Sequence, residues 1–536
     1  MAEQENYSKI PLKAFYRPED AGERRYGEDL NDPGQYPYTR GNRLPKPGEG
    51  FIQRELSGEG EPLRSNEQFK YLLEKGQTGI DVIGDSPTMS WLDPDHPLAA
   101  KAVGTQGVSL CRLEDYRELY QGLPLDSISV SNSLAAPFAI GGLYLVAKEN
   151  GFSPAALRGS VVQFILYGED CSYAVNLPLP LRLRLTADCV EFCTREMPRF
   201  HPFLEDTYYI SESGLDSVEE MALGFVEIRY VVNELLRRGL EIDSFAPRIA
   251  ILLNCRMDFF EEIAKIRATR RLFARMMKED YGAQDPRSMA VVIASHTSGL
   301  TMTAQQPFNN ISRGAMQALA LALAGVQAIE ISAFDEAYRT PSPESHLVGL
   351  RTQQLVQLES NVTKVADPLG GSYYLEALTD DIEKRIWDMV RDIESRGDPG
   401  HLAGTGWFRD LIVKAMERYS DQIQSGALQK VGVNAHQIPE EEDTLLKDIA
   451  QKKIEPSWKR IDTIKAHRQQ RDQEGVARAL RELYRVAQGT EENLLHPIIQ
   501  ATAAGATMGE MTGVMRKAYG QPYDFFGMIE SPIGFD

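Results

Sequence analysis

The chain has 536 residues, of which 42% are hydrophobic, and a formal net charge of −19. This composition suffices for a large core in about two domains, and the acidic balance argues against nucleic acid as a partner, because phosphate binding requires a basic surface. No apolar stretch reaches the roughly 18 residues of a transmembrane helix, and the polar N-terminus has no signal-peptide pattern. We therefore expect a cytoplasmic protein with no membrane partner.

The cysteines predict neither a disulfide framework nor a metal site. Cys189 and Cys193 have i,i+4 spacing on a predicted helix, but no second pair and no nearby histidine completes a zinc-ligand set. Buried free thiols are the expected state, which is typical of a reducing compartment.

Short apolar runs alternate with helical stretches over the middle of the chain. Residues 1–65 show little periodicity, and we expect them to form an extended arm that contacts another subunit. The runs predicted to be strands are 79–84, 127–131, 161–166, 207–211, 248–253, 290–295, 327–332 and 362–367. Eight strands alternating with helices predict an α/β fold, a (β/α)8 TIM barrel over residues 66–378, followed by a helical region over residues 379–536. An open doubly wound sheet is disfavoured, because no Gly-x-Gly-x-x-Gly follows any strand.

Serine alternates with aliphatic residues at 127–133, which predicts a strand with one apolar face and one hydroxyl face. Two alternatives remain open at this point. On an edge strand the serines would face water. In a closed barrel they would line the bore, which is normally filled by Val, Ile and Leu, and would make it a polar channel for a threaded ligand. The repeated strand–helix pattern favours the second alternative.

Polar side chains follow the predicted C-terminal ends of the strands, where the active site of such a barrel lies. They include Ser131, Ser133, Tyr209, Ser211, Ser295, His296, Glu336 and Asp367. A lone histidine is often structural and a carboxylate at a strand end often caps a helix, so His296 and Glu336 each have two interpretations. The set can bind and position a ligand but offers little acid–base machinery. This favours an enzyme whose cofactor carries the chemistry.

Several segments resemble the large, substrate-binding subunit of the methylmalonyl-CoA mutase family, the adenosylcobalamin-dependent acyl-CoA mutases. The segments are DPDHP at 93–97, GLPLD at 122–126, FAPR at 245–248, AKIRA at 264–268, TSG at 297–299, TAQ at 303–305, FDEA at 334–337 and DPLGGSYYLEA at 367–377. The resemblance extends over roughly residues 50–520.

This resemblance implies an isomerase that carries out a radical 1,2-rearrangement of an acyl-CoA with adenosylcobalamin as cofactor. Coenzyme A would thread the barrel axis, and the implied CoA-binding residues are Arg54, Ser131, Ser133, Ser160, Arg267, Ser295 and Gln327. Glu336 would hold the adenosyl ribose, and Gly58 would lie beside the adenosyl group.

The resemblance also implies a partner. The family's cobalamin module carries Asp-x-His-x-x-Gly, and no such spacing occurs in this sequence. We therefore expect a separate small cobalamin-binding subunit, faced by residues 379–536, in a heterotetramer, and no metal ligand in this chain.

Five positions depart from the family pattern. Leu56 replaces a stacking tyrosine, Ser172 an arginine that grips a free carboxylate, Val162 a glutamine, Tyr209 a histidine that binds the thioester carbonyl, and His296 a glutamine. Tyr209 and His296 are the predicted catalytic residues, and the other three are predicted to line a wider, more apolar substrate pocket.

These departures bear on the substrate. Because an unpaired buried carboxylate is costly, loss of the arginine argues against methylmalonyl-CoA. We expect a bulky acyl-CoA, an aryl- or alkyl-succinyl-CoA such as 2-(2'-aminophenyl)succinyl-CoA, converted to its malonyl-CoA isomer. Mutases of isobutyryl-, 2-hydroxyisobutyryl- or pivalyl-CoA and a non-catalytic CoA-binding homologue are the alternatives.

Overall fold

The computed structural model describes residues 4–22, 26–46, 48–171, 177–450 and 454–535. The chain divides into two compact units. Unit 1 comprises Met1–Glu55, Asp170–Ser172 and Glu205–Lys452, and unit 2 comprises Leu56–Glu169, Tyr173–Leu204 and Lys453–Asp536. None of the helices in the described ranges combines the length and the apolar character that a bilayer crossing demands.

Unit 2 is built on parallel strands with helices packed against one face. The strands are β4 (Leu56–Ser57), β5 (Gly79–Ile83), β6 (Ser129–Ser133) and β7 (Arg158–Gln163), followed by β8 (Phe200–Asp206), which continues into unit 1. The helices that follow them are α1 (Pro62–Glu74), α2 (Ser86–Met89), α3 (Leu113–Leu119), α4 (Ala136–Glu149), α5 (Gly168–Cys171, at the boundary of the units) and α6 (Leu179–Glu196).

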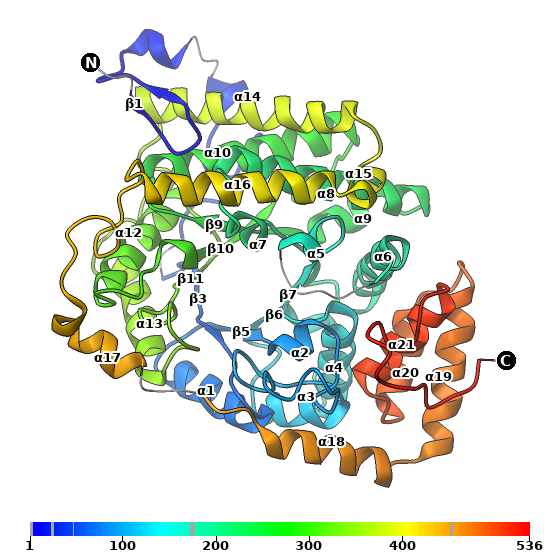
Figure 1. Cartoon of the computed structure of the whole chain (residues 1–536). Helices are drawn as coiled ribbons and strands as arrows, with labels where there is room; N and C mark the ends of the chain where they lie inside the picture. The colour runs from blue at the N-terminus through cyan, green and yellow to red at the C-terminus, as the bar shows by residue number, and fades with distance from the viewer. Residues whose placement is uncertain (1–3, 23–25, 47, 172–176, 451–453, 536) are drawn as a thin grey trace. The chain divides into compact units, whose positions relative to one another are not determined.

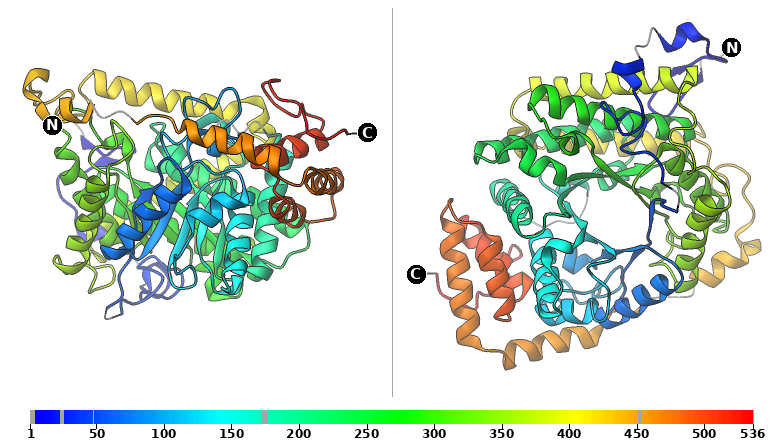
Figure 2. Two further views of the ribbon diagram at one scale, coloured as in Figure 1. Left: turned by 90° about the horizontal axis from the view of Figure 1, so that it is seen from below. Right: turned by 180° about the vertical axis from the view of Figure 1, so that it is seen from behind.

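The C-terminal helices of unit 2 pack on α4 and α6 through α20. They are α18 (Trp458–Gln470), α19 (Gln473–Gln488), α20 (Leu495–Ala503) and α21 (Met508–Ala518). Figure 2 shows them, in orange and red, beside the cyan helices. Arg184 of α6 secures this contact, because its buried guanidinium donates to the carbonyl oxygens of Val486 and Ala487 at 3.0 and 3.1 Å.

Unit 1 contains the strands β3 (Ile52–Gln53), β9 (Ile249–Cys255), β10 (Val292–Thr297) and β11 (Ala328–Glu330), which pair in parallel in the order β3-β11-β10-β9. Its helices are α7 (Thr207–Ser211), α8 (Ser217–Arg237), α9 (Ile242–Phe245), α10 (Phe259–Arg275), α11 (Pro286–Met289), α12 (Asn309–Ala324), α13 (Pro343–Leu358), α14 (Tyr373–Ser395), α15 (Pro399–Thr405), α16 (Trp407–Gln424) and α17 (Thr444–Ala450). A short antiparallel pair, β1 (Gln4–Glu5) and β2 (Pro11–Leu12), lies in the N-terminal arm.

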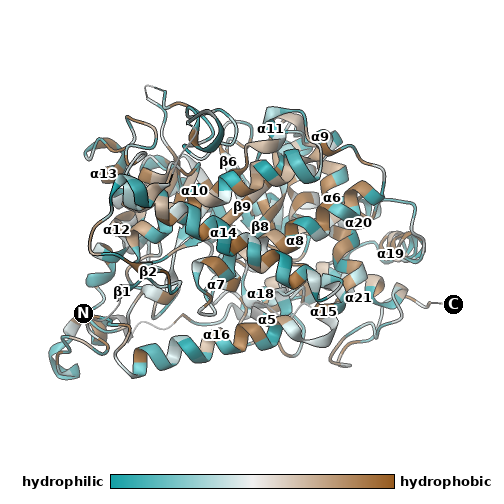
Figure 3. Cartoon of the chain, turned by 90° about the horizontal axis from the view of Figure 1, so that it is seen from above, coloured by the Kyte–Doolittle hydropathy of each residue, from teal (hydrophilic) through white to brown (hydrophobic). Residues whose placement is uncertain are grey.

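Helices α10, α14 and α16 lie outside the strands of unit 1 (Figure 1). The brown and teal bands along α14 in Figure 3 reflect its amphipathic sequence, whose apolar positions recur every three to four residues. Leu378, Ile382, Ile386 and Val390 form its buried stripe. In both units the strands therefore run parallel and successive strands are joined through helices, which confirms the α/β fold of the (β/α)8 barrel type.

Two of the strand predictions are wrong. Residues 207–211 form helix α7 and not the fourth strand, which ends at Asp206. The Asp206 carboxylate accepts a hydrogen bond from the Tyr209 amide at 3.1 Å, and this cap turns the chain from strand to helix. Residues 362–367 form turns, with Asp367 in the left-handed region at φ 44°.

The strand beside β11 comes from the N-terminal arm. Ile52 and Gln53 of β3 stand in register with Ala328 and Ile329. A strand of two residues carries no readable alternation, which explains why the sequence pattern missed both β3 and β4. The remaining predicted strands are present and shifted by a few residues; β6 begins at Ser129 and β7 at Arg158.

The four cysteines whose side chains are described, Cys111, Cys189, Cys193 and Cys255, are buried free thiols, as predicted. Burial raises the pKa of Cys189 well above its usual value, and the adjoining Cys193 raises it further. Burial likewise raises the pKa of Cys111 and Cys255, so these three thiols are protonated core residues.

Candidate active site

A row of small polar residues crosses the strands of unit 2. The register places Leu56 beside Asp81, Asp81 beside Ser131, and Ser131 beside Ser160. The hydroxyl oxygens of Ser131 and Ser160 lie 3.0 Å apart. Residues paired in this way point to the same face of a parallel sheet. Asp81, which the sequence reasoning missed, is 2% exposed. The sequence does contain an indication of this buried polar position, because Asp81 is a single acidic residue within the apolar run of a predicted strand.

The opposite face of these strands is apolar apart from the buried Asn132, which stands in register with Val82 and Val161. Ile80, Val82, Val130 and Val161 belong to the core that packs against α3 and α4. Strand β6 also pairs on both of its sides, so the edge-strand interpretation of its serines is wrong. The hydroxyl face is consequently buried and directed away from the helices, as the bore interpretation requires.

The other predicted residues of unit 2 extend this row. Ser133 and Val162 stand two residues beyond Ser131 and Ser160 on the same strands, and both are buried. At Gly58, just after β4, an added Cβ would lie 2.4 Å from the Ile83 carbonyl oxygen. Close backbone approach therefore excludes every side chain there. Ser172 lies outside the described residues.

In unit 1 a second polar row lies across β9, β10 and β11. His296 stands in register with Asn254 and Glu330, and all three side chains are buried. Glu330 forms a buried ion pair with Arg54. Ser295 occupies the alternate register position, and its hydroxyl donates to the Leu253 carbonyl oxygen at 2.9 Å. The structure therefore does not bring Ser295 to the face that carries His296.

Helix α7 brings two tyrosines to the end of β8. The Tyr208 ring lies 4.7 Å from the His296 imidazole, between centroids, and the Tyr209 ring lies 5.8 Å from that of Tyr208. Tyr208 was missed by the sequence reasoning, because the assumed strand would have placed neighbouring residues on opposite faces. Burial raises the pKa of Tyr208 well above its usual value, and Glu212 and Glu336 raise it further. Its phenol is therefore a protonated hydrogen-bond donor.

The His296 ring is fixed by its own strand. Its Nδ1 lies 2.8 Å from the Thr297 carbonyl oxygen, which can only accept, so Nδ1 carries a proton. Nε2 is then a lone-pair acceptor in the neutral ring and a second donor in the cation. Glu336 is near enough to act on this ring: burial raises the pKa of Glu336, and His296 lowers it by less. One Glu336 oxygen accepts from the Ala333 amide at 2.9 Å.

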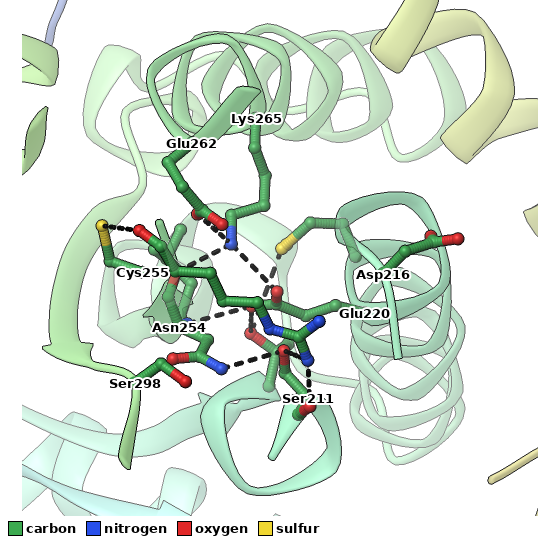
Figure 4. Close-up of polar contacts among 12 residues, drawn as sticks. Ser211, Asp216, Glu220, Asn254, Cys255, Glu262, Lys265 and Ser298 are labelled. Carbon is green, nitrogen blue, oxygen red and sulfur yellow. Dashed lines mark hydrogen bonds and ion pairs between the residues drawn. The ribbon is translucent and has the colours of Figure 1, made fainter. Parts of the chain in front are cut away.

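A buried ion cluster fixes the loops that carry these residues (Figure 4). Lys265 of α10 is completely buried, and its Nζ lies 2.9 Å from Glu220, 2.6 Å from Glu262 and 2.7 Å from the Asn254 carbonyl oxygen. Burial lowers the pKa of Lys265, but the two carboxylates raise it by more, so the ammonium stays charged.

The same cluster extends to α7. The Glu220 carboxylate accepts hydrogen bonds from the Thr207 hydroxyl and from the backbone amide of Asn254, both at 3.0 Å. The Asn254 side chain donates to Ser211 at 3.0 Å and to Glu212 at 2.7 Å. Helix α7, with its two tyrosines, is therefore held at the end of β9 by a chain of charged and polar contacts.

The predicted CoA-binding residues of unit 1 have partners within the chain. Arg267 of α10 is 1% exposed and forms ion pairs with Asp367 and Glu376. Gln327 accepts from the Ile293 amide at 2.8 Å and so joins β10 to the start of β11. Gln327 also lines a cavity of about 100 Å³, whose wall includes the cationic residues Arg40, Arg43 and Lys46.

Replacing Lys265 with Met should destabilise unit 1 strongly. The substitution leaves Glu220 and Glu262 buried without their cation, which costs about 3–5 kcal/mol. Urea unfolding followed by circular dichroism measures this loss. The matched control is Lys384→Met on α14, where the side chain is 75% exposed and pairs with Asp388; there we expect less than about 1 kcal/mol. Equal losses in the two variants would show that the cluster does not stabilise the fold.

Comparison with known proteins identifies the family. The methylmalonyl-CoA mutase family model matches residues 5–521. The chain is 34% identical over 499 residues to the 2-hydroxyisobutanoyl-CoA mutase large subunit of Aquincola tertiaricarbonis, covering 92% of this chain and 88% of that protein. It is 32% identical to the methylmalonyl-CoA mutase of Rhizobium meliloti (strain 1021), covering 95% and 72%, and 30% identical to the mitochondrial enzyme of Homo sapiens, covering 96% and 68%. Members of this family are isomerases, and the chain belongs to the methylmalonyl-CoA mutase family.

Proposed function

We propose that the chain is the large subunit of an adenosylcobalamin-dependent mutase that rearranges the carbon skeleton of a bulky or non-standard acyl-CoA, such as an aryl- or alkyl-succinyl-CoA. The observation that carries the proposal is the row of Asp81, Ser131 and Ser160, which ends in apolar Leu56 and has Val162 beside it. Hydroxyl groups suit the amides of a pantetheine arm, and aliphatic side chains suit an apolar acyl group. Neither Leu56 nor Val162 can pair with a carboxylate at the position that methylmalonyl-CoA would place it, so methylmalonyl-CoA is disfavoured. The carboxylate of a substituted succinyl-CoA would lie elsewhere, at His296 Nε2, which is a donor in the imidazolium form.

The anionic end of coenzyme A needs cations at the other end of the strands. Arg40, Arg43 and Lys46 line the 100 Å³ cavity at the start of β11, together with Gln327. Arg40 pairs with Asp367, and Arg43 and Lys46 share Glu49, so phosphates would take the place of these carboxylates. Because β10 and β11 are parallel, this cavity and His296 belong to opposite strand ends. A threaded ligand would place its phosphates near these cations and its thioester near His296. Arg54 and Arg267 would act by holding strand and helix in place, since each forms a buried ion pair with a carboxylate.

The residues present fit an adenosyl group. Glu336 has a desolvated carboxyl group whose raised pKa suits exchange of hydrogen bonds with ribose hydroxyls. At Gly58 the Ile83 carbonyl oxygen occupies the space of a Cβ, so no side chain projects beside the end of β4. When bound, adenosylcobalamin would supply the adenosyl radical that abstracts hydrogen from the substrate. The chain's own residues would bind and orient the substrate. Tyr209 would donate a hydrogen bond to the thioester carbonyl oxygen, and His296 Nε2 would form a hydrogen bond with a second oxygen of the substrate.

The cobalt ligand would come from a second chain. The sequence contains no Asp-x-His-x-x-Gly, and one relative is named a large subunit. We propose a small cobalamin-binding subunit, contacted by residues 1–65 and 379–536, in a heterotetramer.

A 2-hydroxyisobutyryl-CoA mutase is the second candidate. It is favoured by the name of the relative at 34% identity and by two hydroxyl donors, Tyr208 beside His296 and Tyr209 beside Tyr208. Isobutyryl- and pivalyl-CoA mutases need only the apolar pocket, and a non-catalytic homologue would bind coenzyme A alone.

Reconstitution with a cobalamin-binding small subunit and adenosylcobalamin tests the proposal. The complex is mixed with acyl-CoA esters, and electron paramagnetic resonance records the coupled radical signal. We expect a signal with a substituted succinyl-CoA and at least about tenfold slower turnover of methylmalonyl-CoA. A signal with 2-hydroxyisobutyryl-CoA alone would establish the second candidate, and silence with every ester despite tight cobalamin binding would establish the non-catalytic one.

Tyr209→Phe should lower turnover more than it lowers CoA affinity. Loss of a hydrogen-bond donor to a carbonyl that gains charge reduces kcat by about 10²–10³. We expect the Kd for coenzyme A, measured by calorimetry, to stay within about twofold. Tyr208→Phe is the matched comparison, because it keeps the ring contact with His296. Unchanged turnover in Tyr209→Phe would remove Tyr209 from the mechanism.

A further inference from the structure

A cavity of about 730 Å³ lies within unit 1, apart from the strand faces described above. Its wall is formed by the N-terminal arm, by the loop between β9 and α10, and by the segment that follows α16. Tyr7, Arg256, Arg313, Tyr419 and Lys430 are among its lining residues. None of the residues assigned to coenzyme A or to the adenosyl group lines it, so the inference below does not rest on the proposed function.

The arm is an ordered part of this wall. The Tyr7 hydroxyl donates to the Gly214 carbonyl oxygen at 3.1 Å, and the Tyr7 amide donates to Asp258 at 3.2 Å. The Ser8 amide donates to Glu261 at 3.2 Å. Three contacts on two separate segments fix the arm over the cavity.

Arg256 is the central residue of the wall. It is 8% exposed, and its Nη2 donates to the carbonyl and hydroxyl oxygens of Ser211. Its Nε and Nη1 are buried and have no hydrogen-bond partner among the described residues. These two nitrogens carry most of the guanidinium's N–H groups. The guanidinium carbon lies over the Tyr7 ring, 4.7 Å from its centroid. A ring face is a weaker partner than an oxyanion, so these N–H groups remain able to donate to an oxyanion.

Two more cations line the same cavity. Lys430 Nζ donates to the Leu300 carbonyl oxygen, and Arg313 donates to the Val431 carbonyl oxygen at 2.9 Å. Neither of these two contacts is with a carboxylate. Burial first, and then the nearby charges of Arg313 and Arg256, lower the pKa of Lys430 to about 8, although Glu212 opposes this shift.

The acids on the wall do not neutralise this set. Glu262 forms an ion pair with Lys265 at 2.6 Å, and Asp258 accepts from the Tyr7 amide. Lys9 and Glu5, both on the arm, offset one another in charge. The cavity therefore has an excess of positive charge, together with apolar surface from Met257 and Leu428.

We propose that this cavity binds a small molecule through an oxyanion, a phosphate or carboxylate group, held by Arg256 with Lys430 and Arg313. Oxyanions accept several charge-assisted hydrogen bonds at once and match the donors that Arg256 leaves unused. The volume accommodates a molecule up to nucleotide size. The Arg256 guanidinium also donates to Ser211 at the end of α7. A ligand bound to Arg256 would therefore be connected through this one side chain to the helix that carries Tyr208 and Tyr209.

Isothermal titration calorimetry on the full chain tests the site. The probes are inorganic phosphate, pyrophosphate and succinate, so that phosphate and carboxylate ligands are distinguished. We expect at least one probe to bind with one site per chain. We expect its Kd to rise at least about tenfold in Arg256→Met and in Lys430→Met, since each removes a charge-assisted contact.

The matched control is Arg237→Met on α8, whose side chain is 73% exposed. Its Kd should equal that of the unmodified chain. Lys430→Met keeps the test decisive if Arg256→Met does not fold, because Lys430 is only partly buried and its main contact is one carbonyl. Absence of binding by all three probes, or equal affinity in Lys430→Met and in the control, would overturn the proposal.

Discussion

The buried ammonium of Lys265 is the interaction on which the rest of the site depends. Its Nζ contacts the carboxylates of Glu220 and Glu262 and the carbonyl oxygen of Asn254, near the end of β9. All of these residues are buried. Removing the ammonium leaves two buried carboxylates without their cation, so the cluster favours one arrangement of α8, α10 and β9. Glu220 then extends this order to Thr207, and Asn254 extends it to Ser211 and Glu212. The positions of Tyr208 and Tyr209 on α7 therefore depend on the buried Lys265 charge, through Glu220 and Asn254.

A second constraint is that the two faces of each strand have different roles, one in apolar packing and one in carrying polar residues. In unit 2 the alternate positions Ile80, Val82 and Val130 supply the apolar packing. The positions between them are then available for polar residues, and Asp81 and Ser131 occupy them. A barrel whose strands carry large aliphatic residues on both faces has a filled bore. Here stability comes from the outer face, which frees the other face to bind a ligand.

The sequence predicted what depends on local pattern and missed what depends on pairing. The alternation at 127–133 predicted the hydroxyl face of β6, because period-2 alternation is a local property. Residues 207–211 looked like a strand by composition, but the Asp206 cap and the contacts of Thr207 with Glu220 and Leu252 make them a helix. Because a strand places neighbouring side chains on opposite faces, this error assigned Tyr209 to the site and left Tyr208 out.

Two other features of the site also depend on pairing. Ser295 follows the polar pattern at a strand end, yet the register with Leu253 and Ile329 turns it to the opposite face from His296. The assignment of Arg267 to coenzyme A came from a matching segment, and only the fold shows that Asp367 and Glu376 already neutralise it. Partners distant in sequence decide both cases.

The central claim is that coenzyme A passes along the row of Asp81, Ser131 and Ser160. Titration calorimetry of coenzyme A into Ser160→Val tests it most directly, because valine removes the hydroxyl bonded to Ser131 and adds bulk at the same point of the path. Exposed Ser127, on the loop before β6, is the matched position for Ser127→Val. The account predicts an affinity at least about tenfold weaker in Ser160→Val and unchanged in Ser127→Val. Equal affinity in the two variants would contradict it.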